Sequence, residues 1–227
     1  ELACVQARLA IDNTRDGWLA GFYTAEYAAQ FDLILPTLAA LRAPLPLGGT
    51  SNHFRTHVLR RAGAWDSYNV TEDADLGMRL FKRGLKTAVI DSTTYEEANS
   101  QLGNWIRQRS RWVKGYIQTY LVHMRNPIRL WRELGTYPFF AFQMVIGGTF
   151  FGFLMNPIFW TMTVCWYLFE WPLIRELFPP PIFVMGTLGL YFGNFAFIYI
   201  NVAGSLRREY YPLVKYALIT PLYWMMM

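Results

Sequence analysis

The sequence predicts an α/β domain followed by membrane helices. In the first half of the 227-residue chain, segments with helical spacing alternate with short extended segments, a pattern typical of a sheet covered by helices. Most of the charged residues lie before Glu133. Beyond that point, residues 138–169 and 182–206 contain no Asp, Glu, Lys or Arg. Two such different compositions in one chain indicate two solvents, water and lipid.

The overall composition narrows the class of protein. Hydrophobic residues make up 53% of the chain and charged residues only 16%, which is too apolar for an ordinary soluble domain. The net charge of +5 suits nucleic acid, anionic lipid or a phosphorylated substrate, and the apolar, aromatic sequence makes nucleic acid the least favoured of the three. Cys4 and Cys165 lie far apart, so neither a disulfide framework nor a metal cluster is indicated. The chain starts without Met or a signal-like leader and stops inside an apolar run, so we expect it to be a piece of a longer protein.

The elements expected in the first half follow from periodicity and breakers. We predict an aromatic-rich helix over residues 17–41 and a loop rich in Pro and Gly over 44–50. A short helix over 56–62 that ends at Gly63, a further helix over 73–83 and a buried strand over 87–90 follow. The helix over 73–83 begins with acidic and ends with basic residues, which complements the helix dipole.

The clearest helix is predicted over residues 102–121. Its apolar residues recur every three or four positions, in a stripe that Arg109 interrupts. Residues 123–132 are basic and aromatic, which suits a segment at the lipid headgroups. We therefore divide the chain into a soluble domain, an interfacial linker and a membrane region, at 1–121, 122–137 and 138–227.

The membrane region is expected to hold about three hydrophobic segments. A spanning helix needs about 20 apolar residues. The first stretch, 138–169, exceeds this, so Asn156-Pro157 either breaks it into an interfacial and a spanning piece or kinks one tilted helix. Residues 182–206 suit an ordinary span, and 213–227 resemble the start of a third.

Charges between these segments predict the orientation. The loop over residues 170–181 carries Arg175 against Glu170 and Glu176, whereas the loop over 207–215 carries three basic residues against one Glu. The positive-inside rule then places the second loop, and with it the soluble domain, in the cytoplasm. We expect a multi-pass protein of the inner (cytoplasmic) membrane.

The tripeptide Thr71-Glu72-Asp73 has two interpretations. Acidic residues are common at helix N-termini, and for an isolated match that interpretation is preferred. The functional alternative makes Asp73 a general base. A sugar hydroxyl is a poor nucleophile at neutral pH, and a carboxylate that accepts its proton accelerates the reaction by roughly 10²–10⁴-fold. Glu72 is a second candidate or a supporting residue.

The segment Gln108-Arg109-Ser110-Arg111-Trp112 also has two interpretations. Gln108, Arg111 and Trp112 are spaced i, i+3 and i+4, which predicts one helical face. An amide, a guanidinium and an indole together suit a phosphorylated, sugar-bearing ligand. The alternative is an Arg snorkelling and a Trp anchoring at a membrane interface. The neighbouring Asp73 motif and the apolar stretches that follow favour the ligand site.

Other candidates are weaker. Gly48-Gly49-Thr50-Ser51-Asn52 suits a turn, although glycines also let a backbone approach a ligand. The three His residues, His53, His57 and His123, lack metal-ligand spacing. No Ser/His/Asp arrangement or phosphate-binding loop is evident in the sequence.

These motifs resemble those of the processive, membrane-integrated family-two glycosyltransferases, the group that includes bacterial cellulose synthase and related exopolysaccharide synthases. The resemblance rests on Thr71-Glu72-Asp73, Gln108-x-x-Arg111-Trp112, the Gly48–Ser51 loop and the basic-aromatic segment before the apolar stretches, and it covers about residues 1–205. It implies the C-terminal part of a nucleotide-sugar-binding α/β domain of the GT-A type, followed by interfacial helices and a transmembrane polymer channel.

The resemblance also implies roles for individual residues. Asp73, with Glu72 beside it, would deprotonate the acceptor hydroxyl. Residues of the second motif would lie over the donor diphosphate and the acceptor sugar, and residues of the glycine loop would approach the acceptor end; these are Gln108, Arg109, Arg111 and Trp112, and Gly49, Thr50 and Ser51. The reaction would be inverting transfer from a UDP-sugar to a growing β-linked polysaccharide, aided by Mg²⁺ or Mn²⁺.

Two departures from the family leave alternatives open. The metal-binding Asp-x-Asp and the uridine-binding acids would lie upstream of Glu1, so no metal ligand is assigned here and the fragment alone is expected to be inactive. The segment Leu45-Pro46-Leu47 is less aromatic than its counterpart in cellulose synthase, so the product need not be cellulose. The alternatives are transfer of one sugar to a polyprenyl phosphate and a non-catalytic membrane partner of a synthase.

Overall fold

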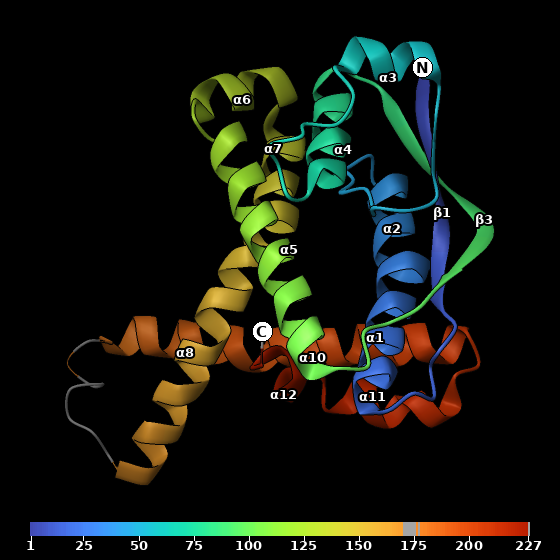
Figure 1. Cartoon of the computed structure of the whole chain (residues 1–227). Coiled ribbons are helices and arrows are strands. Elements are labelled where there is room, and N and C mark those ends of the chain that lie inside the picture. The colour runs from blue at the N-terminus through green and yellow to red at the C-terminus, as the bar shows by residue number, and fades with distance from the viewer. Residues whose placement is uncertain (170–175, 177, 227) are drawn as a thin grey trace.

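The computed structural model describes residues 1–169, 176 and 178–226. The chain has a mixed α/β architecture that is mostly helical (Figure 1). Its three-stranded sheet has the order β2-β1-β3, with β1 at Leu2–Ile11, β2 at Asn52–Phe54 and β3 at Lys86–Glu96. β1 pairs antiparallel with β2 and parallel with β3.

The central strand is the main element that the sequence did not predict. In β1, residues on both faces are buried, among them Ala3, Cys4, Gln6 and Ala7. A strand covered on both faces lacks the alternation of polar and apolar residues that marks a half-exposed strand. The predicted strand over 87–90 is confirmed as part of β3, which continues to Glu96.

The helices of the first half follow the prediction closely. The expected helix over 17–41 is confirmed as α1 (Trp18–Ala29), a π-helical turn (Gln30–Ile34) and α2 (Leu35–Ala40) in direct succession. α3 (Thr56–Ala62) ends at Gly63, whose φ of 85° is in the left-handed region that a glycine adopts without strain. α4 spans Glu72–Lys82, within one residue of the prediction.

Two apolar clusters hold these elements together. One joins the sheet to α2 and α4 through Leu35, Leu47, Leu76 and Leu80. The other joins α1 to α5 (Leu102–His123) and to the C-terminal segment through Leu19, Phe22, Trp105 and Tyr223. The second cluster places the motif-bearing face of α5 beside α1.

The segment after α5 differs in part from the expectation. α6 (Pro127–Leu134) occupies the predicted interfacial linker, and α7 (Thr136–Phe142) leads through a π-helical turn (Gln143–Gly147) into α8 (Gly148–Phe169). Pro157 lies inside α8, so the predicted division at Asn156-Pro157 is wrong. The helix continues past this residue because proline costs one backbone hydrogen bond without ending a long apolar helix.

Among the described residues, one helix is long and apolar enough to cross a membrane. It is α10 (Pro180–Arg207), with 28 residues, and it passes α1 at close range. A Cβ added at Gly204 would lie 2.6 Å from the backbone nitrogen of Ala29. This single candidate does not support the multi-pass arrangement. Most of the charged loop predicted over 170–181 lies outside the described residues.

The segment predicted as the start of a third span is not one continuous helix over residues 213–226. The chain there forms a 3-10 turn (Tyr211–Leu213) and two short helices, α11 (Val214–Leu218) and α12 (Thr220–Trp224). Proline residues interrupt the helical run, and Tyr223 is only 1% exposed in the α1–α5 cluster. Ala217, Thr220 and Tyr223 are buried against the domain, whereas Leu218, Ile219 and Leu222 are exposed.

Candidate active site

One cavity of about 1030 Å³ collects residues from several distant parts of the chain. They come from α1 to α2, the glycine loop, the start of α4, the end of β3, one face of α5, and from α8 and α10; the places of these elements in the fold can be followed in Figure 1. Seven of the predicted site residues line it: Gly49, Thr50, Glu72, Asp73, Gln108, Arg109 and Trp112. Arg111 is exposed and Ser51 is half-buried, and neither lines this cavity.

Asp73 lies at the second position of α4, against the glycine loop. Its Oδ1 accepts a hydrogen bond from the Ala74 backbone nitrogen at 2.7 Å, and a Cβ added at Gly49 would lie 3.4 Å from its Oδ2. Burial raises the pKa of Asp73 from 3.8 to about 6, although the Ala74 hydrogen bond acts in the opposite direction. A carboxylate with a pKa near the working pH is well suited to accept a proton.

Three contacts fix the start of α4 against α5. The Asn69 side chain donates to the Thr119 hydroxyl at 2.9 Å, and His123 lies 2.9 Å from Asp75. Gly115 allows the closest approach, because a Cβ there would come within 2.4 Å of Thr71. The position of Asp73 relative to the α5 motif is therefore set by packing within one turn of the carboxylate.

Arg109 is buried, although the sequence pattern presented it as a break in an apolar stripe. It is 4% exposed and lies between the rings of Tyr23 and Trp112, 4.8 Å and 4.7 Å from their centroids. Its Nη1 donates to Glu26 at 2.9 Å and its Nη2 to the Tyr223 hydroxyl at 2.8 Å. The charge of Arg109 is thus balanced by Glu26, and the Arg109 guanidinium stacks on one face of the Trp112 ring.

The α5 face in the cavity therefore differs from the predicted one. Gln108, Arg109 and Trp112 point into the cavity wall, whereas Arg111, which the spacing had grouped with Gln108 and Trp112, faces outward. Residues three and four positions apart lie on the same broad side of a helix, but not all of them face the same neighbour. Here Arg109 forms an ion pair with Glu26 of α1, so the side of α5 that carries Arg109 is buried and Arg111 is left exposed.

The glycine loop is held by one fully buried amide. The Gly48 backbone nitrogen donates to Gln6 Oε1 at 2.8 Å, and Gln6 Nε2 donates to the Thr50 carbonyl at 2.9 Å. The Ser51 carbonyl accepts from the Ala7 backbone nitrogen, and the Ser51 side chain contacts the Thr94 hydroxyl. The loop is thereby fixed to β1 with Gly49 and Thr50 on its cavity side.

Several cavity residues were missed by sequence reasoning. Glu26 could have been suspected, because it is the only charged residue in the apolar helix α1. Glu96 at the end of β3 lines the cavity, and burial raises its pKa. Asn99 in the next segment does not line the cavity, but it donates to Gln108 Oε1 at 2.9 Å and so positions a residue that does. Nothing in the local sequence of these last two residues indicates a site.

The far end of the cavity runs between α8 and α10. Most residues there are apolar or are glycines, but the side-chain amides of Asn156, Asn194 and Asn201 also line this part of the cavity. Asn194 is 9% and Asn201 3% exposed, and within the described part of the chain neither Oδ1 has a hydrogen-bond partner. A buried amide oxygen without a partner is costly, so these two atoms mark places where a ligand hydroxyl would be favoured.

The expected divalent metal has no site among these residues. No three His, Cys, Asp or Glu side chains come together anywhere in the described ranges. The pair Glu72 and Asp73 alone offers too few ligands for a protein-bound Mg²⁺ or Mn²⁺, so no step of the chemistry is derived through a metal here.

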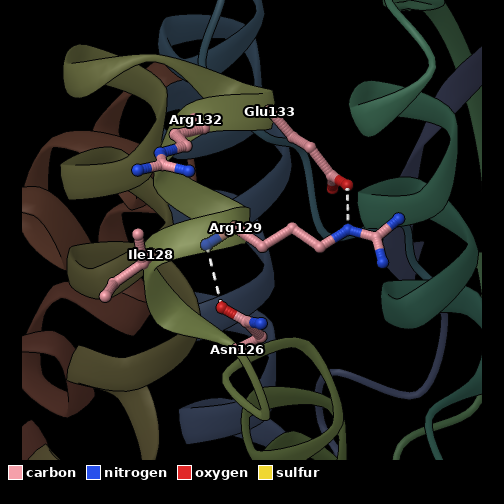
Figure 2. Close-up of a pocket in the computed structure, with 5 residues that line it drawn as sticks. All are labelled: Asn126, Ile128, Arg129, Arg132 and Glu133. Atoms are coloured by element: carbon pink, nitrogen blue, oxygen red, sulfur yellow. Dashed lines mark hydrogen bonds and ion pairs between the residues drawn. The ribbon is translucent and has the colours of Figure 1, made fainter.

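A second, shallower hollow is lined by residues of α6, whose polar side chains make contacts that stabilise the helix. Figure 2 shows that the Asn126 side chain accepts a hydrogen bond from the Arg129 backbone nitrogen, which caps the helix, and that Arg129 pairs with Glu133. Glu133 also pairs with Lys82 at 3.1 Å. These contacts join α6 to α4 and leave no titratable group poised for chemistry.

Known proteins with similar sequences indicate the family of this chain. The chain is 28% identical over 113 residues to the probable glycosyltransferase YdaM of Bacillus subtilis, covering 49% of this chain and 27% of that protein. It is 26% identical over 106 residues to the beta-monoglucosyldiacylglycerol synthase of Synechocystis, covering 44% of this chain and 22% of that protein. The alignments thus span about a quarter of the length of these relatives. Residues 1–225 match the model of the glycosyl transferase family group 2, and the chain therefore belongs to this family of glycosyltransferases.

Proposed function

We propose that this chain forms the acceptor side of an inverting glycosyltransferase that uses a UDP-sugar. The observation that carries the proposal is a half-buried carboxylate, Asp73, which lines the same cavity as Gln108 and Trp112 and has a pKa raised to about 6. The acceptor hydroxyl attacks the anomeric carbon of the donor while Asp73 takes its proton. The bond from that carbon to the diphosphate oxygen breaks, and UDP leaves with the electron pair.

The donor side of the reaction draws on the α5 motif. Arg109 occupies one face of the flat Trp112 ring, so a sugar would stack on the opposite face. Arg111 is exposed next to Trp112 but lies outside the cavity lining, so we assign to it only the part of a diphosphate that extends out of the cavity. Replacing Arg111 by Ala is expected to weaken UDP binding by about 1.5–3 kcal/mol. Ligands for Mg²⁺ or Mn²⁺, and the rest of a GT-A-type domain, are assigned to parts of the enzyme outside this chain.

For the acceptor, we favour the hydroxyl end of a growing β-linked polysaccharide. The support is the row of amides, Asn156, Asn194 and Asn201, in the part of the cavity between α8 and α10. Among the described residues the side-chain oxygens of Asn194 and Asn201 have no hydrogen-bond partner, whereas that of Asn156 accepts from Asn194 at 3.3 Å. The two unpartnered oxygens match the hydroxyl groups of a glycan and have nothing to offer a hydrocarbon chain. With α10 as a candidate span, the proposed site lies at the cytoplasmic face of the inner membrane.

A second candidate is transfer of one sugar to a lipid hydroxyl. It is favoured by the apolar side chains that α8 and α10 contribute to the cavity, such as Met155, Phe159 and Leu190. The similarity to a beta-monoglucosyldiacylglycerol synthase points in the same direction. A polyprenyl phosphate acceptor has less support, because the cavity wall carries more carboxylates than cations. A non-catalytic partner of a synthase is also less favoured, because that function does not require a carboxylate with a raised pKa such as Asp73.

Product analysis with the full-length enzyme in membranes separates these candidates. We expect a radiolabelled polymer from one of several UDP-sugars, no transfer by Asp73→Asn, and unchanged UDP binding by that variant. Replacing both Asn194 and Asn201 by Leu should shorten the polymer while single-sugar transfer persists. A product of one sugar that extracts into organic solvent would establish the lipid acceptor instead, and full transfer by Asp73→Asn would remove Asp73 from the mechanism.

A further inference from the structure

The cavity contains a second carboxylate across the glycine loop from Asp73. Gly49 lies against the Asp73 carboxyl, where an added Cβ would be 3.4 Å from Oδ2, and the hydroxyl of the next residue, Thr50, lies 3.5 Å from Glu96 Oε2. Two adjacent loop residues thus touch two carboxylates that come from α4 and from the end of β3. A sugar whose hydroxyl reaches Asp73 over this loop would also lie within reach of Glu96.

The charge of this cavity is unbalanced. Its wall carries the carboxylates of Glu26, Glu72, Asp73 and Glu96, and one guanidinium, that of Arg109. Arg109 is engaged by Glu26 in a two-point ion pair. Among the described residues no basic side chain forms an ion pair with Glu96. The acceptor end of the cavity is therefore negative, and at Glu96 the carboxylate is met, within the part of the chain that the structure describes, by the neutral hydroxyls of Tyr27 and Thr50 alone.

We propose that Glu96 is a specificity residue that accepts a hydrogen bond from a hydroxyl of the acceptor sugar and excludes acidic sugars from that position. This rests on the proposed function of the cavity and names its acceptor as an uncharged sugar. An ionised carboxylate only accepts hydrogen bonds, so it matches hydroxyl groups of a neutral pyranose. A uronate at the same place would set two negative charges side by side in a partly dehydrated site, which disfavours binding.

The test uses two acceptors that differ in one group. Octyl β-D-glucoside and octyl β-D-glucuronide are offered to the full-length enzyme with its radiolabelled UDP-sugar, and kcat/KM is measured for each. Wild-type enzyme is expected to prefer the glucoside by at least about tenfold, the ratio that corresponds to 1.36 kcal/mol. Glu96→Gln keeps the shape and a hydrogen-bond acceptor but removes the charge, so the preference should fall about tenfold, mainly through better use of the glucuronide.

The matched control is Glu97→Gln, at the exposed neighbouring position. It should keep the wild-type preference, and both variants should melt at the wild-type temperature. The inference is overturned if wild-type enzyme uses the two acceptors equally, if Glu96→Gln keeps the wild-type ratio, or if Glu97→Gln changes the ratio as much. Asp73→Asn tests the underlying function separately, because it should abolish transfer to both acceptors without bearing on their ratio.

Discussion

At the scale of single residues, the protonation of Asp73 should govern the rate. Its carboxyl is withdrawn from water behind the glycine loop, and this burial raises its pKa to about 6. Only the ionised form can accept a proton from the acceptor. We therefore expect kcat/KM of the full-length enzyme to fall about tenfold per pH unit below pH 6 and to level off above it. A rate profile measured between pH 4.5 and 8 checks this, and a plateau that extends to pH 4.5 would exclude Asp73 as the base.

The same shift predicts a stability change of definite sign. The folded-state pKa of Asp73 lies above the ordinary value of 3.8, so its contribution to folding is fully present below about pH 3.8 and is lost as pH rises through 6. Asp73→Asn removes the cost of burying the ionised form. The variant should therefore melt at a higher temperature than wild type at pH 8 and at nearly the same temperature at pH 4.

Arg109 and Arg111 show where residue-level prediction stops. Sequence spacing correctly placed the motif on a helix, now α5, but it predicted only approximately which of the motif's side chains face the cavity. What decides between the two arginines is Glu26, which is 83 residues away from Arg109 in the sequence and meets it only in the folded chain. Because one carboxylate neutralises Arg109, an anionic ligand would have to use a guanidinium outside the cavity lining, such as that of Arg111.

At the scale of elements, the spacing between α4 and α5 is the feature that positions the base. Gly115 faces Thr71, the residue at the N-terminal boundary of α4 two positions before Asp73, and a Cβ on Gly115 would meet the Thr71 side chain at 2.4 Å. Gly115→Ala must therefore displace the start of α4. A misplacement of about 1 Å costs roughly a hundredfold in rate, so we expect kcat to fall by about that factor while UDP binding stays unchanged.

Gly103 on the same helix supplies the control. An added Cβ there would meet nothing within 4 Å. Gly103→Ala should keep full activity and stabilise the protein by up to about 1 kcal/mol, since it only removes conformational freedom from the unfolded chain. If Gly115→Ala transferred sugar at the wild-type rate, the contact between α4 and α5 would not determine where Asp73 lies.

Elements with a strong period were predictable, and elements defined by their surroundings were not. α4 and α5 have amphipathic spacing and charged ends, and both were predicted within two residues of their bounds. β1 is buried on two faces and has no such period. In the segment 213–226, Tyr216, Tyr223 and Trp224 pack in the cluster of α1 and α5, and composition alone cannot distinguish such contacts from a membrane span.

At the scale of the whole molecule, the site exists only because distant elements converge. The sequence indicated that Asp73 and Trp112 should meet, but the wall that α8 and α10 add to the cavity depends on how these helices dock onto the domain. α10 is held by Gly204 against α1 and by the ion pair of Arg208 with Asp32 in the π-helical turn. The docking therefore relies on one close backbone contact and one buried charge pair.

The ion pair is the more testable of these two contacts. Asp32 is 3% exposed and receives hydrogen bonds from Arg208 Nε at 2.6 Å and Nη2 at 2.8 Å, whereas Arg8 lies 3.8 Å away. Arg208→Met would leave a buried carboxylate poorly compensated, a loss of about 3–5 kcal/mol. We expect the melting temperature of the full-length enzyme to fall by about 5–15 °C.

A neighbouring residue separates the loss of this contact from the loss of a positive charge. Arg207 is exposed in the last turn of α10, and Arg207→Met should melt like wild type. The double variant Asp32→Asn with Arg208→Met should recover part of the loss, because it removes the stranded charge as well. Equal melting of the Arg207 and Arg208 single variants would mean that α10 is held on the domain by apolar packing around Gly204, and that the charge pair contributes nothing to the alignment of the cavity.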